Sequence, residues 1–323
     1  MKFITGTLVA LLATGATFAA MAQGGAYPSK PVRIIVPYVP GGTVDLVARV
    51  LAQRLTEQTG QQFIVDNRAG ASGVIGSDAV AKAAPDGYTL LVQSPTLIAN
   101  PLMTKKTPYD VIKDFTPISM MGSVPMVMTV NAAIPANTLQ ELVAAARANP
   151  KQYAFGTSAI GSPMHVALEA IKHDSKLEVP IIGYKGTAAA LNDVLGGQIS
   201  AIVDAIPSSA PHIASGKLKA IAVTTRERVA SLPNVPTVAE SGFPEFEMSS
   251  WYGLWGPARL PDDVTKKLAA EVAKAMKSPL VAERLGSQGF IASGMGPQPF
   301  SGFITKETAM YARTVRNANI QIE

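Results

Sequence analysis

The chain has 323 residues, of which 47% are hydrophobic and 16% charged, so it can form two domains with large cores and is unlike a disordered protein. Its formal net charge is +5, with the charges scattered along the chain, which argues against nucleic-acid binding and agrees with an anionic small ligand. The absence of cysteine excludes disulfides, thiolate catalysis and zinc–thiolate sites.

Residues 1–22 read as a cleavable secretory signal peptide. Lys2 gives a positive start, ITGTLVALLATGATFAA is apolar, and Ala20-Met21-Ala22 fits the small-x-small pattern that precedes cleavage. A transmembrane anchor is the alternative, and it is disfavoured because glycines and threonines interrupt the apolar run and no basic flank follows. We therefore expect a mature protein that is soluble and lies outside the cytoplasm.

Strand and helix patterns alternate after the leader. The expected strands are Val32–Val36, Gln62–Asp66 and Tyr88–Gln93, and the expected helices lie near Val44–Gln58 and Gly73–Ala83. In the first of these helices, apolar residues recur at helical spacing from Val44 to Leu55. Short strands separated by helices predict a parallel, doubly wound sheet.

A polar segment, TKKTPYDVIKDFTPIS, interrupts this pattern, and the apolar stretch MMGSVPMVMTVN after it is expected to form one long strand. A second alternation follows. Its expected elements are helix Leu139–Ala148, strand Tyr153–Gly156, helix Pro163–Lys172, strand Val179–Gly183, helix Thr187–Leu195, strand Ile199–Asp204, helix Ser208–Ser215 and strand Leu218–Val223. MSSWYGLWGPA predicts another long strand, and the last expected helices are Asp262–Lys277, Leu280–Gln288 and Pro297–Asn317.

Two alternating units joined by long apolar strands, near 123–131 and 248–257, predict an α/β protein of two lobes, each with a doubly wound, mainly parallel sheet. We assign residues 27–123 and 250–323 to lobe one, with C-terminal helices that pack partly on lobe two, and residues 124–249 to lobe two. Open α/β sheets bind ligands at the carboxyl ends of their strands, so the strand-to-helix turns are expected to line a cleft between the lobes.

Three glycine-containing turns each follow an expected strand and open an expected helix. They are PYVPGGTVD at Pro37–Asp45, FGTSAIGSPMH at Phe155–His165 and YKGT at Tyr184–Thr187. Their candidate N-cap hydroxyls are Thr43, Ser162 and Thr187. The first amides of a helix lack partners within the helix, and the peptide dipoles add about half a positive charge there. Any one turn suits an ordinary connection, but three turns in two lobes favour a clamp for a carboxylate or phosphate.

Sequence support for catalysis or a cofactor is thin. The GxxGxxG stretch at Gly70–Gly76 lacks the spacing of a dinucleotide fingerprint. Ser158 lies in GTSAIG, where Ile160 replaces the second glycine of a hydrolase elbow. His165 has a glutamate one turn along the helix, but no third metal ligand is evident. No cofactor and no metal are expected, while an exported hydrolase or transferase using Ser158 or Ser162 with His165 stays open as an alternative.

Several other side chains have two readings. Asp204, at the end of a strand, could recognise a ligand amine or hydroxyl, or it could cap the following turn. Lys185 could face the cleft or the solvent. The aromatic residues that could wall a ligand are Tyr38, Trp251, Tyr252 and Trp255. For the two tryptophans, packing in the core or hinge is the favoured role.

Several stretches of the chain carry a family resemblance. They are YPSKPVRIIVPYVPGGTVD, NRAGASGVIGSDAVAKAAPDGYTLL, TPYDVIKDFTPIS, YAFGTSAIGSPMH, GYKGTAAALNDVLGGQI, KLKAIAVTTRERVASLPNVPTVAESG and SWYGLWGPA. In their order and spacing the chain resembles the periplasmic substrate-binding proteins of tripartite tricarboxylate transporters, the Bug family. The resemblance implies a type II, Venus-flytrap binding protein, monomeric and without catalytic activity. It would capture a di- or tricarboxylate, an amino acid or an aromatic acid and pass it to membrane permease subunits; a ligand-sensing subunit of a signalling system is a further reading.

The resemblance also implies which residues hold the ligand carboxylate. From lobe one these are Tyr38, Gly41, Gly42 and Thr43, and from lobe two they are Thr157, Ser158, Gly161, Ser162 and His165. The second-tier positions are Ser94, Lys185, Gly186 and Asp204. The family's second turn often has glycine where this chain has Ala159 and a polar residue where it has Ile160. This difference favours an aromatic or otherwise apolar monocarboxylate over citrate.

Overall fold

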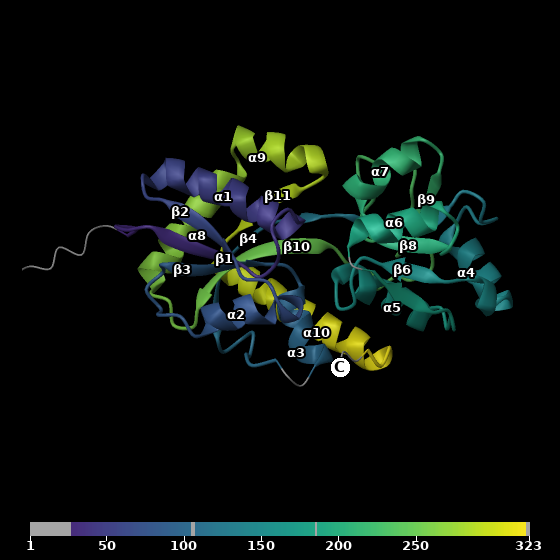
Figure 1. Ribbon diagram of the computed structural model, residues 1–323, viewed down its shortest axis with the longest axis horizontal. Helices are drawn as coiled ribbons and strands as arrows, with labels where there is room; N and C mark the ends of the chain where they lie inside the picture. The colour runs from purple at the N-terminus through teal and green to yellow at the C-terminus, as the bar shows by residue number, and fades with distance from the viewer. Residues whose placement is uncertain (1–26, 105–106, 185, 321–323) are drawn as a thin grey trace, which may run out of the picture.

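The computed structural model describes residues 27–104, 107–184 and 186–320, so the expected signal peptide and Lys185 lie outside the described residues. Figure 1 shows two lobes side by side along the long axis, each built on a sheet with helices against its faces. Lobe one holds a six-stranded sheet and lobe two a five-stranded sheet, as far as the described residues go. No helix within those residues is long and apolar enough to cross a membrane.

The six-stranded sheet of lobe one has the order β11-β4-β10-β3-β1-β2. Its strands are β1 (Val32–Val36), β2 (Phe63–Asn67), β3 (Thr89–Gln93), β4 (Phe115–Val124), β10 (Ser250–Pro257) and β11 (Ile291–Met295). β1 pairs in parallel with β2 and β3, while β10 is antiparallel to β3 and β4, and β11 is antiparallel to β4. The sheet is therefore mixed.

The five-stranded sheet of lobe two has the order β7-β6-β8-β5-β9. Its strands are β5 (Met126–Asn131), β6 (Phe155–Thr157), β7 (Ile181–Gly183), β8 (Ala201–Ala205) and β9 (Leu218–Val223). β6 is parallel to β7 and β8, but β5 is antiparallel to β8 and β9. The expectation of mainly parallel sheets thus holds for most strands, because β1 to β4 run in one direction within their sheet and β6 to β9 run in one direction within theirs. The strands that run against their neighbours are β5, β10 and β11.

Helices pack against the faces of both sheets. They are α1 (Thr43–Thr59), α2 (Val74–Ala81), α3 (Thr96–Met103), α4 (Leu139–Ala148), α5 (Pro163–Asp174), α6 (Thr187–Leu195), α7 (Ile206–Ala214), α8 (Asp262–Met276), α9 (Pro279–Arg284) and α10 (Pro297–Asn317). Short 3-10 turns lie at Ala71–Gly73, Pro150–Gln152 and Gly286–Gln288. The buried side of α1 carries Val47, Leu51 and Leu55, the helical spacing expected from the sequence.

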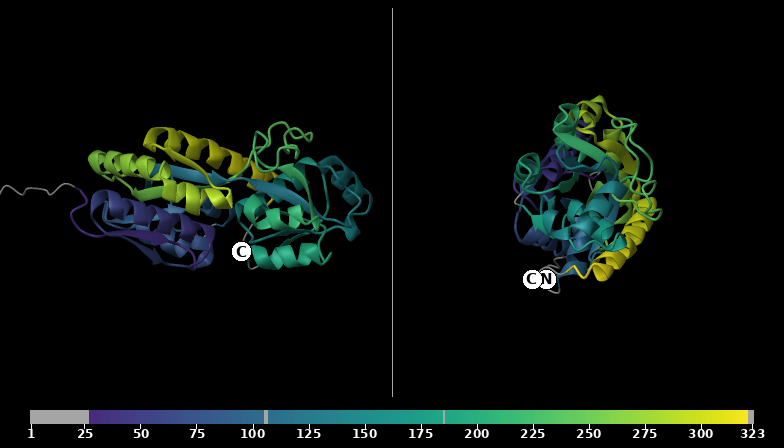
Figure 2. Two further views of the ribbon diagram at one scale, coloured as in Figure 1. Left: turned by 90° about the horizontal axis from the view of Figure 1, so that it is seen from above. Right: turned by 90° about the vertical axis from the view of Figure 1, so that its right-hand side faces the viewer.

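The chain crosses between the lobes at two places. At the first crossing the single long strand expected over MMGSVPMVMTVN is wrong, because β4 ends at Val124 and β5 begins at Met126. Pro125 lies between them, and a proline has no amide hydrogen to donate to a sheet. The second crossing leads through Met248 into β10. Helix α10, yellow in Figure 2, packs on α3 and β4 and also on α5, so it touches elements of both lobes.

The two tryptophans lie in the core, as favoured from the sequence. Trp251 and Trp255 are completely buried, and their ring centroids are 5.9 Å apart. Phe300 of α10 packs edge-on against Trp251 and tilted against Trp255. Aromatic packing of this kind fixes α10 to β10, because it buries large apolar rings in a preferred geometry.

Candidate functional site

The strand-to-helix turns of lobe one end at the junction between the lobes. Because β4 is antiparallel to β10 and β10 is antiparallel to β3, β4 runs in the same direction as β1, β2 and β3. The carboxyl end of β4, at Val124, continues directly into lobe two. The carboxyl ends of β1, β2 and β3, and the N-termini of α1, α2 and α3 that follow them, therefore point toward lobe two.

The turns of lobe two point back toward lobe one. Met126, at the start of β5, pairs with Ala205, at the end of β8. Since β6 and β7 are parallel to β8, their carboxyl ends also lie at the junction, together with the N-termini of α5, α6 and α7. Carboxyl ends of parallel strands are where open α/β sheets bind ligands, and here two such edges face each other (Figure 1).

The 37–45 turn differs in detail from the sequence-based expectation. Gly42 is the N-cap of α1 and makes no side-chain cap, so Thr43 is the first helical residue and its expected N-cap role is wrong. Asp45 reaches back from the first turn, where its Oδ2 accepts the Gly41 N–H at 3.0 Å. The hydrogen-bond acceptor that an N-cap side chain would provide is thus the carboxylate of Asp45, the third residue of the helix. This contact is similar to that of a capping box.

Asp45 is held firmly by three donors. Its carboxylate also accepts hydrogen bonds from Arg49 Nε and Asn67 Nδ2, both at 2.9 Å. Burial alone would raise the pKa of Asp45, but the hydrogen bonds from Arg49, Gly41 and Asn67 lower it below its usual value. The Gly41 amide is therefore occupied within the protein, while the amides of Gly42 and Thr43 make no hydrogen bond to any described residue.

In the 155–165 turn, Ser162 is the N-cap of α5, as predicted, and its Oγ accepts the His165 N–H at 3.2 Å. The Gly161 N–H donates to His165 Nδ1 at 3.2 Å. Because burial, with a contribution from Lys172, lowers the pKa of His165 to about 4, the ring is neutral at pH 7. His165 is 4% exposed, and its ring holds the turn through the bond from Gly161.

The turn before α6 is fastened to the turn before α5. The Gly186 N–H donates to the Ser158 carbonyl at 2.8 Å, and the Tyr184 N–H donates to the Thr157 carbonyl at 2.9 Å. Gly186 is the N-cap of α6, so Thr187 is the first helical residue and the N-cap role expected for it is wrong. The two turns form one connected surface at the edge of lobe two.

Asp204, at the end of β8, is almost completely buried, with 2% of its surface exposed. Its Oδ1 accepts the Thr187 hydroxyl at 3.3 Å, and its Oδ2 has no hydrogen-bond partner among the described residues. Burial raises the pKa of Asp204 to about 6, although the Ala205 amide and the hydroxyls of Thr187 and Ser208 oppose the rise. The observed hydrogen bond joins Asp204 to α6, the helix before β8, and one carboxylate oxygen stays unpaired among the described residues.

A group of polar side chains lies at the lobe-one edge around Tyr38. Ser94 Oγ and Thr96 Oγ1 are 2.9 Å apart, and Gln93 Oε1 accepts the Ser94 N–H at 2.8 Å. Burial raises the pKa of the Tyr38 hydroxyl, while hydrogen bonds with Thr96, Ser94 and Gln93 oppose the rise. Ser94 was a predicted site residue; Gln93 and Thr96 were not, and their only sequence signal is their position at the end of a strand.

Tyr252 links this group to lobe two. Its hydroxyl lies 3.0 Å from Ser250 Oγ, and both side chains project from the same face of the crossing strand β10. Burial raises the pKa of Tyr252; hydrogen bonds with Ser250 and Thr43 oppose the rise, and the charge of Asp204 adds to it. Residues of both lobes therefore interact electrostatically across the junction.

The structure does not bring all of the predicted site residues into contact with one another. No hydrogen bond between described residues connects the 155–162 turn of lobe two with the 37–43 turn of lobe one. A small cavity of about 60 Å³ lies between α1 and α7, where Thr43 faces Ala205 and Ser208. No group of three or more described His, Asp or Glu residues is placed to hold a metal ion.

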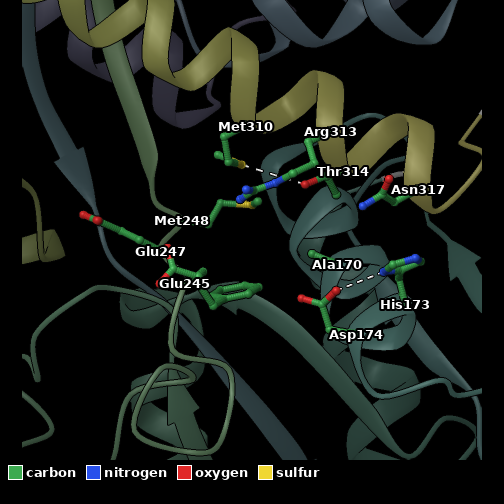
Figure 3. A pocket seen from close by; sticks show the side chains of 11 residues that line it. Ala170, His173, Asp174, Glu245, Glu247, Met248, Met310, Arg313, Thr314 and Asn317 are labelled. Carbon is green, nitrogen blue, oxygen red and sulfur yellow. Dashed lines mark hydrogen bonds and ion pairs between the residues drawn. The ribbon is translucent and has the colours of Figure 1, made fainter.

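Another cavity, of about 290 Å³, lies between α5, the 245–248 segment and α10 (Figure 3). Its lining residues are Ala170, His173, Asp174, Glu245, Phe246, Glu247, Met248, Met310, Arg313, Thr314 and Asn317. None of these is a predicted ligand-binding residue. The cavity is therefore separate from the turns at the junction.

Two α/β lobes, joined by two crossings and facing each other with their strand-to-helix turns, define a solute-binding protein of the periplasmic type. A family model described as "Tripartite tricarboxylate transporter family receptor" matches residues 47–320, and the chain belongs to this family. Three of the proteins that it resembles are the following.

Protein BugT of Bordetella pertussis is 37% identical over 98% of this chain and 98% of BugT. The solved structure of periplasmic binding protein BugD is 32% identical, with a TM-score of 0.78 over 92% of this chain and 100% of BugD. R. palustris Rpa4515, solved with adipate, is 34% identical, with a TM-score of 0.80 over 91% of this chain and 99% of Rpa4515. The predicted family is confirmed.

Proposed function

We propose that the chain is a periplasmic receptor that captures a small carboxylate between its lobes and delivers it to membrane permease subunits. The observation that carries this proposal is the convergence of six strand-to-helix turns on the lobe junction, with the Gly42 and Thr43 amides unpaired among the described residues. Unpaired amides at a helix N-terminus bind anions without a charged side chain. A relative, Rpa4515, was solved with adipate, a small carboxylate.

In this proposal the ligand carboxylate contacts Gly42 and Thr43 of lobe one and Ser158 and Ser162 of lobe two. Gly41, Gly161 and His165 act behind the binding surface, because the two glycine amides are already bonded to side chains of their own helices. The lobes close on the ligand by bending at Pro125 and at the start of β10. Closure is driven only by the contacts that the closed form adds.

The alternative of a hydrolase using Ser158 or Ser162 with His165 lacks the required contact. A serine nucleophile needs its hydroxyl within hydrogen-bond reach of the histidine ring. Here Ser162 Oγ accepts the backbone N–H of His165 and donates to the Ala159 carbonyl at 2.7 Å. His165 Nδ1 accepts from Gly161, and its Nε2 lies 3.7 Å from Glu169. These contacts favour binding without turnover.

The proposal is tested with the freshly purified mature protein by native mass spectrometry, which detects a retained ligand, and by thermal unfolding with a panel of carboxylates. We expect one carboxylate of the panel to bind with a stoichiometry of one molecule per monomer and to raise the melting temperature of the protein. At a concentration of one hundred times Kd the stabilisation is about 2.7 kcal/mol. A protein that neither retains nor binds any carboxylate, or that turns over an ester substrate, contradicts the proposal.

A further inference from the structure

We infer that the ligand is a monocarboxylate with an apolar body and that Ile160 contacts this body. The inference deepens the proposed function and rests on it. Three exposed apolar side chains lie in or beside the turns that end at the junction. Val39, in the turn before α1, is 68% exposed; Ile75, in the first turn of α2, is 55% exposed; Ile160, in the turn before α5, is 39% exposed.

These three side chains come from both lobes and follow strands whose carboxyl ends meet at the junction. Exposing apolar surface to water on both faces of a junction is unfavourable, and burying it against an apolar ligand is favourable. Ile160 is also fixed in position, because a Cβ at Gly183 would lie 2.6 Å from Ile160 Cγ1. The isoleucine therefore lies against the Gly183 backbone, and a larger residue at position 183 would displace it.

The charge balance at the junction favours a single negative charge on the ligand. Of the six helix N-termini at the junction, those of α1 and α5 are the two that the proposed function places at the carboxylate. Each contributes about half a positive charge, so together they balance about one carboxylate. The cations near the lobe-one turns are already paired among the described residues. Arg49 Nε lies 2.9 Å from Asp45, and Arg68 Nε lies 3.1 Å from Asp66.

A second carboxylate on the ligand would face acidic surroundings. Asp204 is buried at the lobe-two edge with an oxygen that is unpaired among the described residues, and Tyr252, whose pKa the charge of Asp204 raises, and Ser250 are neutral hydroxyl residues. Removing a second anion from water without a counter-charge is strongly unfavourable. The body of the ligand is therefore expected to be apolar where it leaves the helix N-termini and meets Ile160.

The test is calorimetric titration with matched acids that share a carbon skeleton: hexanoate against adipate and benzoate against phthalate, with butyrate as a short reference. Wild type is compared with Ile160→Ser. The control is Ile112→Ser, because Ile112 is 62% exposed but precedes β4 at the end of the sheet away from the junction. Thermal unfolding of each variant checks that it folds.

One of the two monocarboxylates, hexanoate or benzoate, should bind more tightly than the other. We expect its Kd to be at least tenfold lower than that of the dicarboxylate with the same carbon skeleton. If hexanoate is the tighter monoacid, each methylene between butyrate and hexanoate should tighten Kd about fourfold. Ile160→Ser should weaken that monoacid about tenfold and leave butyrate within twofold, while Ile112→Ser changes neither.

Two results overturn the inference and leave the proposed function standing. One is tighter binding of adipate or phthalate than of the matched monoacid. The other is an Ile160→Ser variant whose affinity is reduced by the same factor for every acid, or is reduced for none. An equal reduction would mean that Ile160 contacts the opposite lobe on closure. If no acid of the panel binds the wild type, the proposed function itself fails.

Discussion

The Gly161 N–H donates to His165 Nδ1 at 3.2 Å, and in the other lobe the Gly41 N–H donates to Asp45 Oδ2 at 3.0 Å. In both turns a glycine amide before the helix is bonded to a side chain four residues further along. The acceptor is a neutral imidazole in lobe two and a carboxylate paired with Arg49 in lobe one. The two turns thus share this contact.

The two turns differ in the amides that follow it. In lobe one the Gly42 and Thr43 amides stay unpaired among the described residues. In lobe two the Ser162 N–H donates to the Ala159 carbonyl at 3.3 Å, and Pro163 has no amide hydrogen, so neither position offers a free amide.

His165→Ala tests whether the imidazole shapes the binding turn. The change leaves the Gly161 amide unpaired and opens a cavity, so the free energy of unfolding should fall by about 2 to 3 kcal/mol. Affinity for the carboxylate, measured by calorimetry, should fall about tenfold because the turn loses its support. The control His173→Ala, at an exposed position of the same helix, should change both by little. A variant that keeps full affinity but loses a turnover would favour the hydrolase alternative.

Gly42→Val tests the lobe-one amides. A Cβ at Gly42 meets nothing within 4 Å, and its φ of −81° suits any residue, so the fold should tolerate valine. The branched side chain would stand over the unpaired amides and weaken carboxylate binding about tenfold or more. Gly296→Val is the matched control, since Gly296 is also an extended N-cap with open space around it but lies at the start of α10. Equal affinities of Gly42→Val and wild type would remove the first turn from the binding site.

Gly73→Ala tests the polar group around Tyr38. Gly73 has a φ of +91°, and a Cβ there would lie 2.8 Å from Gln93 Nε2 and 3.2 Å from the Tyr38 hydroxyl. Alanine should cost about 1 to 3 kcal/mol of stability and weaken binding by displacing Tyr38. Gly60→Ala controls for backbone strain, because Gly60 has a φ of +71° but free space at the far end of α1. The site assignment fails at this position if the two variants bind equally well.

Asp204 predicts the pH dependence of binding. Its pKa is raised to about 6, so it is mostly neutral at pH 5 and mostly ionised at pH 7.5. The ionised form repels an anionic ligand, and carboxylate affinity should therefore fall about three- to tenfold between these pH values. Asp204→Asn should abolish this decrease, whereas Asp174→Asn, at an exposed position, should retain it. A flat profile in the wild type would place Asp204 away from the ligand.

Glu307 predicts the pH dependence of stability. Trp251 Nε1 donates to Glu307 Oε2 at 2.7 Å. Burial raises the pKa of Glu307 to about 7; the hydrogen bond from Trp251 opposes the rise, and the charge of Glu247 adds to it. A raised folded-state pKa gives stability that is present below about pH 4.5 and is lost as the pH rises through about 7.

Glu307→Gln keeps an oxygen that accepts the Trp251 hydrogen bond and removes the ionisation. At pH 8 this variant should be more stable than the wild type by about 3 kcal/mol, and at pH 4.5 the two should be nearly equal. Chemical denaturation at both pH values measures the difference. Glu283→Gln, at an exposed helix position, should follow the wild type. A wild type whose stability does not change between these pH values would contradict the assignment.

The local elements could be read closely from the sequence. Helix α6 and strand β9 have the bounds expected from periodicity, and α10 spans Pro297–Asn317 as predicted. Helix α3 was missed because it is short and contains Pro101, and strand β11 was missed because IASGM has few strand-forming residues. The antiparallel pairing of the crossing strands depends on contacts far apart in the chain, which periodicity does not report.

For the candidate site, the positions of the turns followed from the sequence, but the partners of their amides did not. Asp45 is visible in the sequence as an acid in the first turn of a helix, and its bond to Gly41 is a local signal that could have been used. Gln93 and Tyr252 join the site only because β1 and β3 end where β10 begins. Such long-range contacts need the fold before they can be named. The proposed lobe boundaries, after residues 123 and 249, stay a prediction.

The most direct test of the account is a crystal structure of the protein with the tightest-binding carboxylate of the panel. The account predicts closed lobes, with oxygens of one carboxylate about 2.7 to 3.2 Å from first-turn amides of α1 and hydrogen-bonded to the turn before α5. A carboxylate bound by one lobe alone, or bound in the cavity between α5 and α10, would contradict it.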